Sequence, residues 1–198
     1  KFGSLSNSIM YFRVANLAAR IGRDVSGRFT GGNVSLAEVP LDVLKGAGAW
    51  RFAQGRLSLS DVTFRLEDRE LDDRFQPLVS NGASLVLASN RITAQATMLE
   101  PQSQRAVVRA DIKHDLGSGI GQADLTMDEL LFDRKLQPDT ISRLILGVVA
   151  NAEGKVRGTG RIDWIPVGCF SSGGFTIDSI DFAAAFGPVK GVSGTVEF

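Results

Sequence analysis

The segment KVRGTGRIDW, residues 155–164, decides how the rest of the chain is interpreted, because its side chains alternate strictly in character. Every odd-numbered position is charged or polar. The even-numbered positions are Val156, Gly158, Gly160, Ile162 and Trp164. Successive side chains of a β-strand point to opposite faces, so the segment predicts a strand with one charged face and one apolar or bare face. The fold depends on what covers the bare face, which in a sandwich would be a second sheet.

Three consecutive segments in the middle of the chain repeat this alternation. They are RITAQATML (91–99), RAVVRADIKH (105–114) and GQADLTMD (121–128), with Val107 as an apolar residue on a polar side. The residues between them are of turn-forming types. Period-2 segments of strand length that are joined by turns are typical of an antiparallel meander.

An earlier region, residues 48–68, predicts a hairpin around Gln54-Gly55. In its second arm the apolar positions change parity. A β-bulge near Ser60-Asp61 accounts for the change, because one inserted residue reverses which parity faces inward. The other features expected here are an exposed charged connection at 67–75, a turn at Asn81-Gly82 and a strand within 80–89.

One stretch departs from the alternating pattern. In QPDTISRLILGVVANAEG, residues 137–154, the apolar residues Ile141, Leu144, Ile145 and Val148 recur at helical spacing. Asp139 is a suitable N-cap, and Gly154 lies beyond a suitable end. The pattern therefore predicts one short helix near 139–150, packed at the side or rim of the sheet.

Composition narrows the functional classes. The 198 residues include 22 basic and 22 acidic side chains, which does not favour a nucleic-acid partner. No apolar run approaches the roughly 20 residues of a membrane-spanning helix. The chain begins at Lys1 without a signal peptide, so we expect it to be part of a longer protein. Cys169 is the single cysteine, which excludes an intrachain disulfide.

Residues suited to catalysis or metal binding are few. His114, the single histidine, stands beside Asp115 and could act as a base oriented by a carboxylate, but a polar residue at a strand end is the preferred interpretation. No G-x-S-x-G motif surrounds any serine. One histidine and one distant cysteine cannot form a zinc site. We therefore predict no enzymatic activity, no catalytic residue, no metal and no cofactor.

Three segments resemble a known family. LGVVANAEGKVRGTGRIDWIPVGCFSSGGFTIDSIDFAAAFGPVKGVSGTVEF (146–198) closely resembles the C-terminal region of YdbH-family proteins from proteobacteria. GAWRFAQGRLSLSDVTFRL (48–66) and VRADIKHDLGSGIGQADLTMDELLF (108–132) also resemble that family, a relative of the AsmA-like and TamB-like intermembrane lipid transporters. The resemblance implies a mainly β fold: a long curved antiparallel sheet forming an open groove, whose apolar concave face carries phospholipid tails between the inner and outer membranes.

The resemblance also implies an organisation and partners. Residues 1–198 would be one segment of a longer β-groove domain, cut at both ends. Such a protein would cross the periplasm, with an inner-membrane anchor formed by an N-terminal helix that is absent from this sequence. Its partners would be phospholipid and a small outer-membrane lipoprotein that caps the C-terminal end by β-strand addition.

Other architectures remain open on the pattern alone. Alternating strands are also typical of a closed β-sandwich, barrel or β-helix, serving as a structural or carbohydrate-interacting module of the cell envelope. Small inward residues such as Ala94, Ala96 and Gly158 favour the groove modestly, since sandwich cores are filled by larger side chains. An enzyme acting on polysaccharide would need exposed aromatic residues, which are scarce here.

The residues expected to line the groove share the apolar parity of their strands, and their expected role is to solvate acyl chains. They are Leu85, Leu87, Ile92, Ala94, Ala96, Met98, Val108, Ala110, Ile112, Leu125, Met127, Val156, Ile162, Trp164, Phe175 and Ile177.

Overall fold

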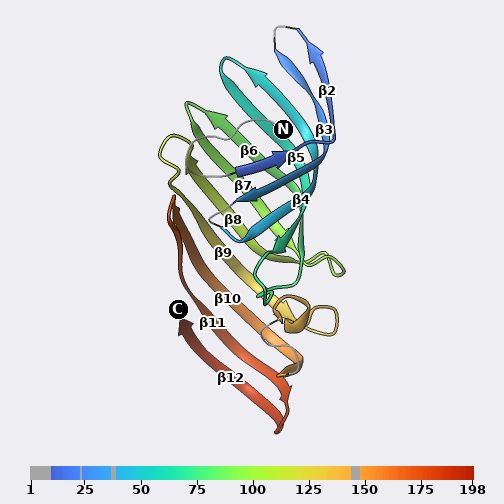
Figure 1. Ribbon diagram of the computed structural model, residues 1–198. Coiled ribbons are helices and arrows are strands. Elements are labelled where there is room, and N and C mark those ends of the chain that lie inside the picture. The colour runs from blue at the N-terminus through green and yellow to red at the C-terminus, as the bar shows by residue number, and fades with distance from the viewer. Residues whose placement is uncertain (1–9, 23, 37–38, 144–147) are drawn as a thin grey trace.

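The computed structural model describes residues 10–22, 24–36, 39–143 and 148–198, and in them the chain forms one open, curved, antiparallel sheet (Figure 1). The sheet has 12 strands. From β3 to β12 each strand pairs with the next in sequence, and β1 and β2 lie end to end along the outer edge of β3. The predicted antiparallel meander is thus confirmed and extends from β2 to β12. No second sheet is present in these residues, so the closed sandwich is wrong.

The bounds of the strands are β1 (Met10–Arg13), β2 (Asn16–Ile21), β3 (Val25–Leu36), β4 (Leu41–Ala53), β5 (Arg56–Asp68), β6 (Leu78–Ala88), β7 (Arg91–Leu99), β8 (Ala106–Asp115), β9 (Gly121–Phe132), β10 (Val149–Ile165), β11 (Gly168–Ala184) and β12 (Gly187–Glu197). Strand β7 coincides with the predicted segment 91–99, whereas β9 and β10 extend beyond the predicted segments 121–128 and 155–164.

Two-residue turns join several strands. The predicted hairpin at Gln54-Gly55 is confirmed, with φ values of 50° and 72°. Ser89 and Asn90 have the same left-handed backbone between β6 and β7, at 49° and 60°. Two consecutive residues with positive φ characterise the tight turns whose twist matches that of the flanking strands.

Bulges interrupt most strand pairs and bend the sheet. The predicted bulge at Ser60-Asp61 is confirmed: Asp61 has φ 51°, and the register with both β4 and β6 shifts there. The predicted turn at Asn81-Gly82 is wrong, because these residues form a bulge inside β6, with Gly82 at φ 85°. Each bulge adds one residue to a strand and increases its local bend and twist.

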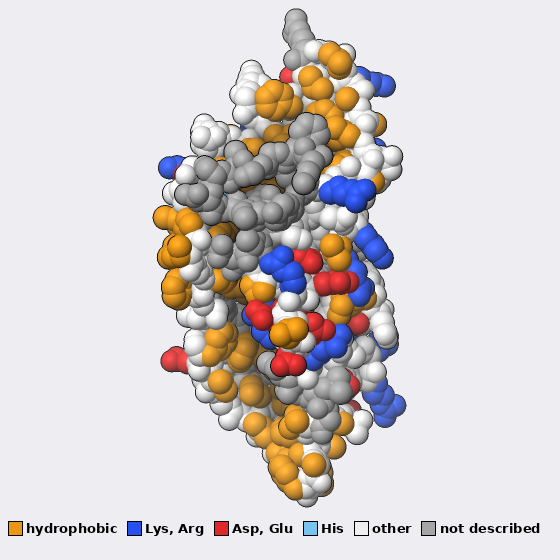
Figure 2. All heavy atoms as spheres, in the orientation of Figure 1, with side chains coloured by type: hydrophobic (Ala, Val, Ile, Leu, Met, Phe, Trp, Pro, Cys, Tyr) orange, Lys and Arg blue, Asp and Glu red, His pale blue; other side chains and the backbone are white. Residues whose placement is uncertain are grey.

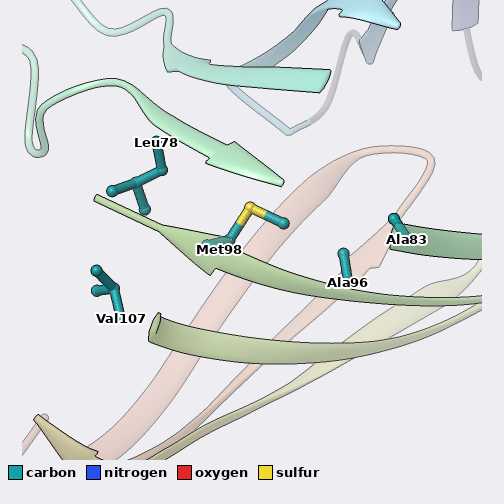
Figure 3. Close-up of a cluster of buried hydrophobic side chains, with 5 residues drawn as sticks. All are labelled: Leu78, Ala83, Ala96, Met98 and Val107. Carbon is teal, nitrogen blue, oxygen red and sulfur yellow. The ribbon is translucent and has the colours of Figure 1, made fainter. Parts of the chain in front are cut away.

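A further bulge explains the exceptional position of Val107. Met98 pairs with Val108 and Leu99 pairs with Ala106, so Val107 has no partner on β7. Its side chain is buried with apolar residues of β6 and β7 instead of pointing to the polar side (Figure 3).

The predicted helix at 139–150 is wrong. The structure has one 3₁₀ turn at Pro138–Thr140, and β10 already begins at Val149; residues 144–147 lie outside the described part. Of the four residues whose spacing predicted the helix, Leu144 and Ile145 lie outside the described residues. Ile141 packs onto two hydrophobic clusters, and Val149 lies in a strand.

Candidate functional site

One face of the sheet carries a continuous apolar surface, which follows from the strand register. Directly paired residues of antiparallel strands point to the same face. Leu85, Ala94, Ile112, Ala123 and Ile162 pair in sequence from β6 to β10 and therefore form one apolar row across five strands. We call this face the concave face, for the reason given by its contacts below.

The contacts across this face show that the sheet curls toward it. Val39, which precedes β4, is buried in a cluster with Ala123 of β9 and Trp164 of β10. Strands β4 and β9 are separated by four others in the sheet. Val39 lies beside β4 and can reach Ala123 and Trp164 only if the sheet bends toward the face on which these two side chains lie. This face is therefore concave.

The opposite face is polar and solvent-exposed. Gln95 donates a hydrogen bond to Asp111 across 2.7 Å, and Arg161 forms ion pairs with Asp124 at 3.3 Å and Asp163 at 2.9 Å. Residues 155–164 follow the same division: Lys155, Arg157 and their polar companions up to Arg161 are exposed, and the apolar residues between them are sheltered. The charged face predicted for this segment is therefore the convex face.

Two chain connections meet over the concave face and form what we call the cross-sheet strap, residues 69–77 and 133–143. Phe75 and Ser142 form a β-bridge, and the Gln76 amide donates to the Ile141 carbonyl across 2.7 Å. Arg143 pairs with Asp73 at 3.1 Å. Figure 2 shows charged side chains gathered over the middle of the molecule, where these connections lie in Figure 1.

The strap covers the apolar surface with its own side chains. Phe75 and Ile141 pack against a cluster formed by Leu78, Ala83, Ala96, Met98 and Val107 (Figure 3). Ile141 also contacts a second cluster formed by Leu130, Phe132, Leu136, Ala152 and Ile180. Among the described residues, these connections cover the part of the apolar face that bears the two clusters.

Asp68 fixes the first half of the strap. Its buried carboxylate accepts two hydrogen bonds of 2.8 Å from the Arg74 guanidinium and others from the backbone amides of Arg74 and Glu70. Burial by itself raises the pKa of Asp68, but these donors outweigh it and lower that pKa to about 2. The connection expected at 67–75 is therefore held at its start by charge-assisted hydrogen bonds to Asp68.

Gln137 fixes the second half of the strap. Its side-chain amide accepts from the Ala152 amide at 2.8 Å and donates to the Ala152 carbonyl at 3.0 Å. This pairing imitates a strand partner for β10, so residues 133–143 are held against the start of that strand.

The register places all of the predicted lining residues on the concave face. Ala96, Met98, Ala110 and Trp164 are buried there, and Phe175 is exposed. The remaining residues are half-buried, namely Leu85, Leu87, Ile92, Ala94, Val108, Ile112, Leu125, Met127, Val156, Ile162 and Ile177. The half-buried members and the exposed Phe175 are the ones available to a ligand in this conformation.

Sequence reasoning missed a second set of concave-face residues. Val62, Phe64 and Leu66 of β5 pair with Ala83, Ser80 and Leu78 of β6, so they face the same side. Alternation within β5 after the bulge marks these three residues as one apolar face, but the expected lining did not include them. Val39, Phe75 and Ile141 lie in connections, where no periodic signal marks them.

His114 is buried on the concave face and makes a hydrogen bond with Trp164 there. Its Nδ1 accepts a 3.1 Å hydrogen bond from Trp164 Nε1, and its ring is buried. Asp115 instead accepts from Gly117 and Ser118 in the following turn and pairs with Arg91. The alternative of a base oriented by Asp115 therefore has no support in the geometry.

Two other classes of site have no counterpart in the described residues. These residues contain no group of three or more His, Cys, Asp or Glu side chains placed to hold a metal ion. No helix in the same residues is long and apolar enough to cross a membrane.

Comparison with known proteins identifies a family for this chain. The model of a family described as YdbH-like, intermembrane phospholipid transport protein YdbH, matches residues 10–198. No curated protein and no solved structure matches the chain.

Proposed function

Because the chain belongs to the YdbH-like family of intermembrane phospholipid transport proteins, we propose that its concave face binds phospholipid acyl chains and conducts them between the inner and outer membranes. The observation that supports this most is the apolar row that crosses β6 to β10 on the concave side of an open sheet. A closed core would leave no such surface to a ligand.

The energetics of lipid transfer suit such a surface. A two-chain lipid contains very roughly thirty methylenes, so its exposure to water would cost on the order of 20 kcal/mol at about 0.8 kcal/mol per methylene. A continuous apolar path lowers that barrier without a catalytic group. Binding through the hydrophobic effect is non-directional, so the chains can slide along the face.

The proposed ligand contacts are the half-buried residues of the predicted set together with the exposed Phe175. Ile92 and Ala94 of β7, with Leu85 and Leu87 of β6, form a patch that lies outside the three hydrophobic clusters. Because none of the three clusters of described residues includes these four side chains, this patch is where we expect acyl chains to bind.

The family places the protein in the cell envelope, and the finer arrangement is part of the proposal. We propose a periplasmic location with an inner-membrane anchor in the complete protein. A small outer-membrane lipoprotein would add a strand to β12. In the described residues β12 pairs with β11 alone, which leaves the backbone groups of its other edge available for strand addition.

Photo-crosslinking in growing cells tests the lipid path. A benzophenone amino acid replaces Ile92 on the concave face or, as the matched control, Thr93 on the convex face. We expect phospholipid adducts at position 92 and none at position 93. Absence of adducts at both positions in folded, abundant protein would refute lipid binding by the concave face.

A further inference from the structure

The end of the β11–β12 hairpin presents an apolar surface that the lipid path described above does not include. Phe186 is 87% exposed in the turn, and Val148, which precedes β10, is 59% exposed. Val149 pairs with Ala184, so Val148 and the turn lie at the same end of neighbouring strands. We call Val148, Ala185, Phe186 and Pro188 the apolar tip.

The apolar tip lacks charge and stands at an extremity of the molecule. Residues 182–189 contain no ionisable side chain. Figure 1 places the β11–β12 turn at the end of the sheet farthest from β2, and Figure 2 shows hydrophobic side chains gathered there. A monomeric soluble protein seldom exposes an aromatic side chain within an uncharged protruding tip.

The tip continues directly into the concave face. Phe182 and Ile180 of β11 belong to the cluster that includes Ile177 and Val156, and Phe182 pairs with Val189 of β12. Apolar side chains therefore extend along β11 from the turn to predicted lining residues without an intervening charge on this face.

We propose that the apolar tip docks into the surface of a phospholipid bilayer, and that the concave side of β11 leads acyl chains between that bilayer and the groove. The second part rests on the proposed function; the docking itself does not. A bilayer suits the tip better than a protein partner because the tip offers apolar side chains and no charged or hydrogen-bonding side chain to fix an orientation. Docking of this kind buries aromatic and aliphatic groups at the interface of the acyl and headgroup regions.

Flotation with phosphatidylcholine vesicles tests the docking on the whole chain. Phe186→Asp should weaken vesicle binding by on the order of tenfold, because it replaces a buried aromatic contact with a charge. Leu71→Asp is the matched control, since Leu71 is fully exposed among charged residues of the strap and should leave binding unchanged. Thermal unfolding of both variants shows whether they fold alike. Binding should be independent of salt and of anionic lipid content.

Equal flotation of Phe186→Asp and the parent chain would overturn the docking proposal. So would a concentration-dependent dimer that Phe186→Asp abolishes without any vesicle binding, because the tip would then serve a second copy. Lipid adducts at position 92 that persist in either case would leave the proposed function standing. Flotation through Phe186 without adducts at position 92 would support docking alone.

Discussion

Trp164 of β10 reaches across β9 to donate its indole N–H to Nδ1 of His114 on β8, and the two rings stack with centroids 5.9 Å apart. The strand between them contributes Gly121, which pairs with both residues. A Cβ at Gly121 would lie 2.4 Å from the indole ring. The missing side chain on β9 is therefore what allows the indole to lie over this strand and link its two neighbours.

Gly121→Ala should lower the free energy of unfolding by about 1–3 kcal/mol, because the indole must move from its buried site. Urea denaturation measures the change. Gly194→Ala is the matched control, since a Cβ at Gly194 meets no atom within 4 Å and should have little effect. Equal effects of the two substitutions would contradict the packing described here.

His114→Leu should cost about 1–3 kcal/mol, because it leaves the buried indole N–H without an acceptor. The double variant His114→Leu with Trp164→Phe removes donor and acceptor together. Its loss in free energy of unfolding should therefore be smaller than the sum of the two single losses. Additive losses in urea denaturation would show that the hydrogen bond contributes nothing.

His114 should also make stability depend on pH. Burial lowers the pKa of His114 below its ordinary 6.5, against a hydrogen bond to Ile120 and the charge of Asp115, which raise it. The unfolded state then binds the proton more readily, so stability is complete above pH 6.5 and falls as the pH drops through the folded-state value. Urea midpoints at pH 7 and pH 5 should differ in the parent chain and differ less in His114→Leu.

Asp68 should govern stability at lower pH. Its folded-state pKa of about 2 lies below the ordinary 3.8, so its contribution is complete above about pH 4 and is lost between pH 4 and pH 2. Arg74→Met removes the paired guanidinium and should cost about 1 kcal/mol at pH 7, given that Arg74 is half exposed. The variant should show a smaller loss between pH 4 and pH 2; an unchanged pH profile would contradict the role of Arg74.

The cross-sheet strap should accept a disulfide. Directly opposed residues of an antiparallel bridge lie within the Cα distances that disulfides span. In a Cys169→Ser background, Phe75→Cys with Ser142→Cys should oxidise to an intramolecular bond, detected by gel mobility. Leu71→Cys with Ser142→Cys is the control and should remain reduced; oxidation of neither pair would mean that the two connections do not meet.

Charge on the concave face should block lipid binding. Ala94→Glu places a carboxylate in the apolar row, whereas Gln95→Glu places one on the convex face beside Asp111. We expect lipid recovered with the purified protein to fall severalfold in the first variant and to be unchanged in the second. Equal lipid content in both folded variants would locate the lipid elsewhere.

Strand positions, and which residues of a strand share a face, were predictable from sequence because both depend on local alternation. Ile92, Ala94, Ala96 and Met98 share a parity within one strand, and antiparallel register carries that face to the neighbouring strands. Even the bulge at Asp61 left a local trace, since it shifts the parity of the residues that follow.

The connections that pack over the concave face were not predictable from local alternation. Val39 contacts strands more than 80 positions away in the sequence, and Phe75 pairs with Ser142. Such contacts depend on how far the whole sheet bends, which accumulates from many bulges. The helix predicted at 139–150 was wrong: Ile141 lies in a connection that packs onto two hydrophobic clusters, and β10 already begins at Val149.

The cross-sheet strap also limits how this fold can change in length during evolution. Strands that contact only their immediate neighbours tolerate the gain or loss of a hairpin, as the repeats of a solenoid do. Phe75, however, lies in the connection from β5 to β6, and Ser142 lies in the connection from β9 to β10. Their contact therefore requires a fixed number of strands, β6 to β9, between the two connections. A hairpin inserted within that span would separate the two connections, whereas one inserted outside it would lengthen the sheet and leave the bridge intact. The strap thus marks a unit of constant size in a sheet that can otherwise grow by duplication.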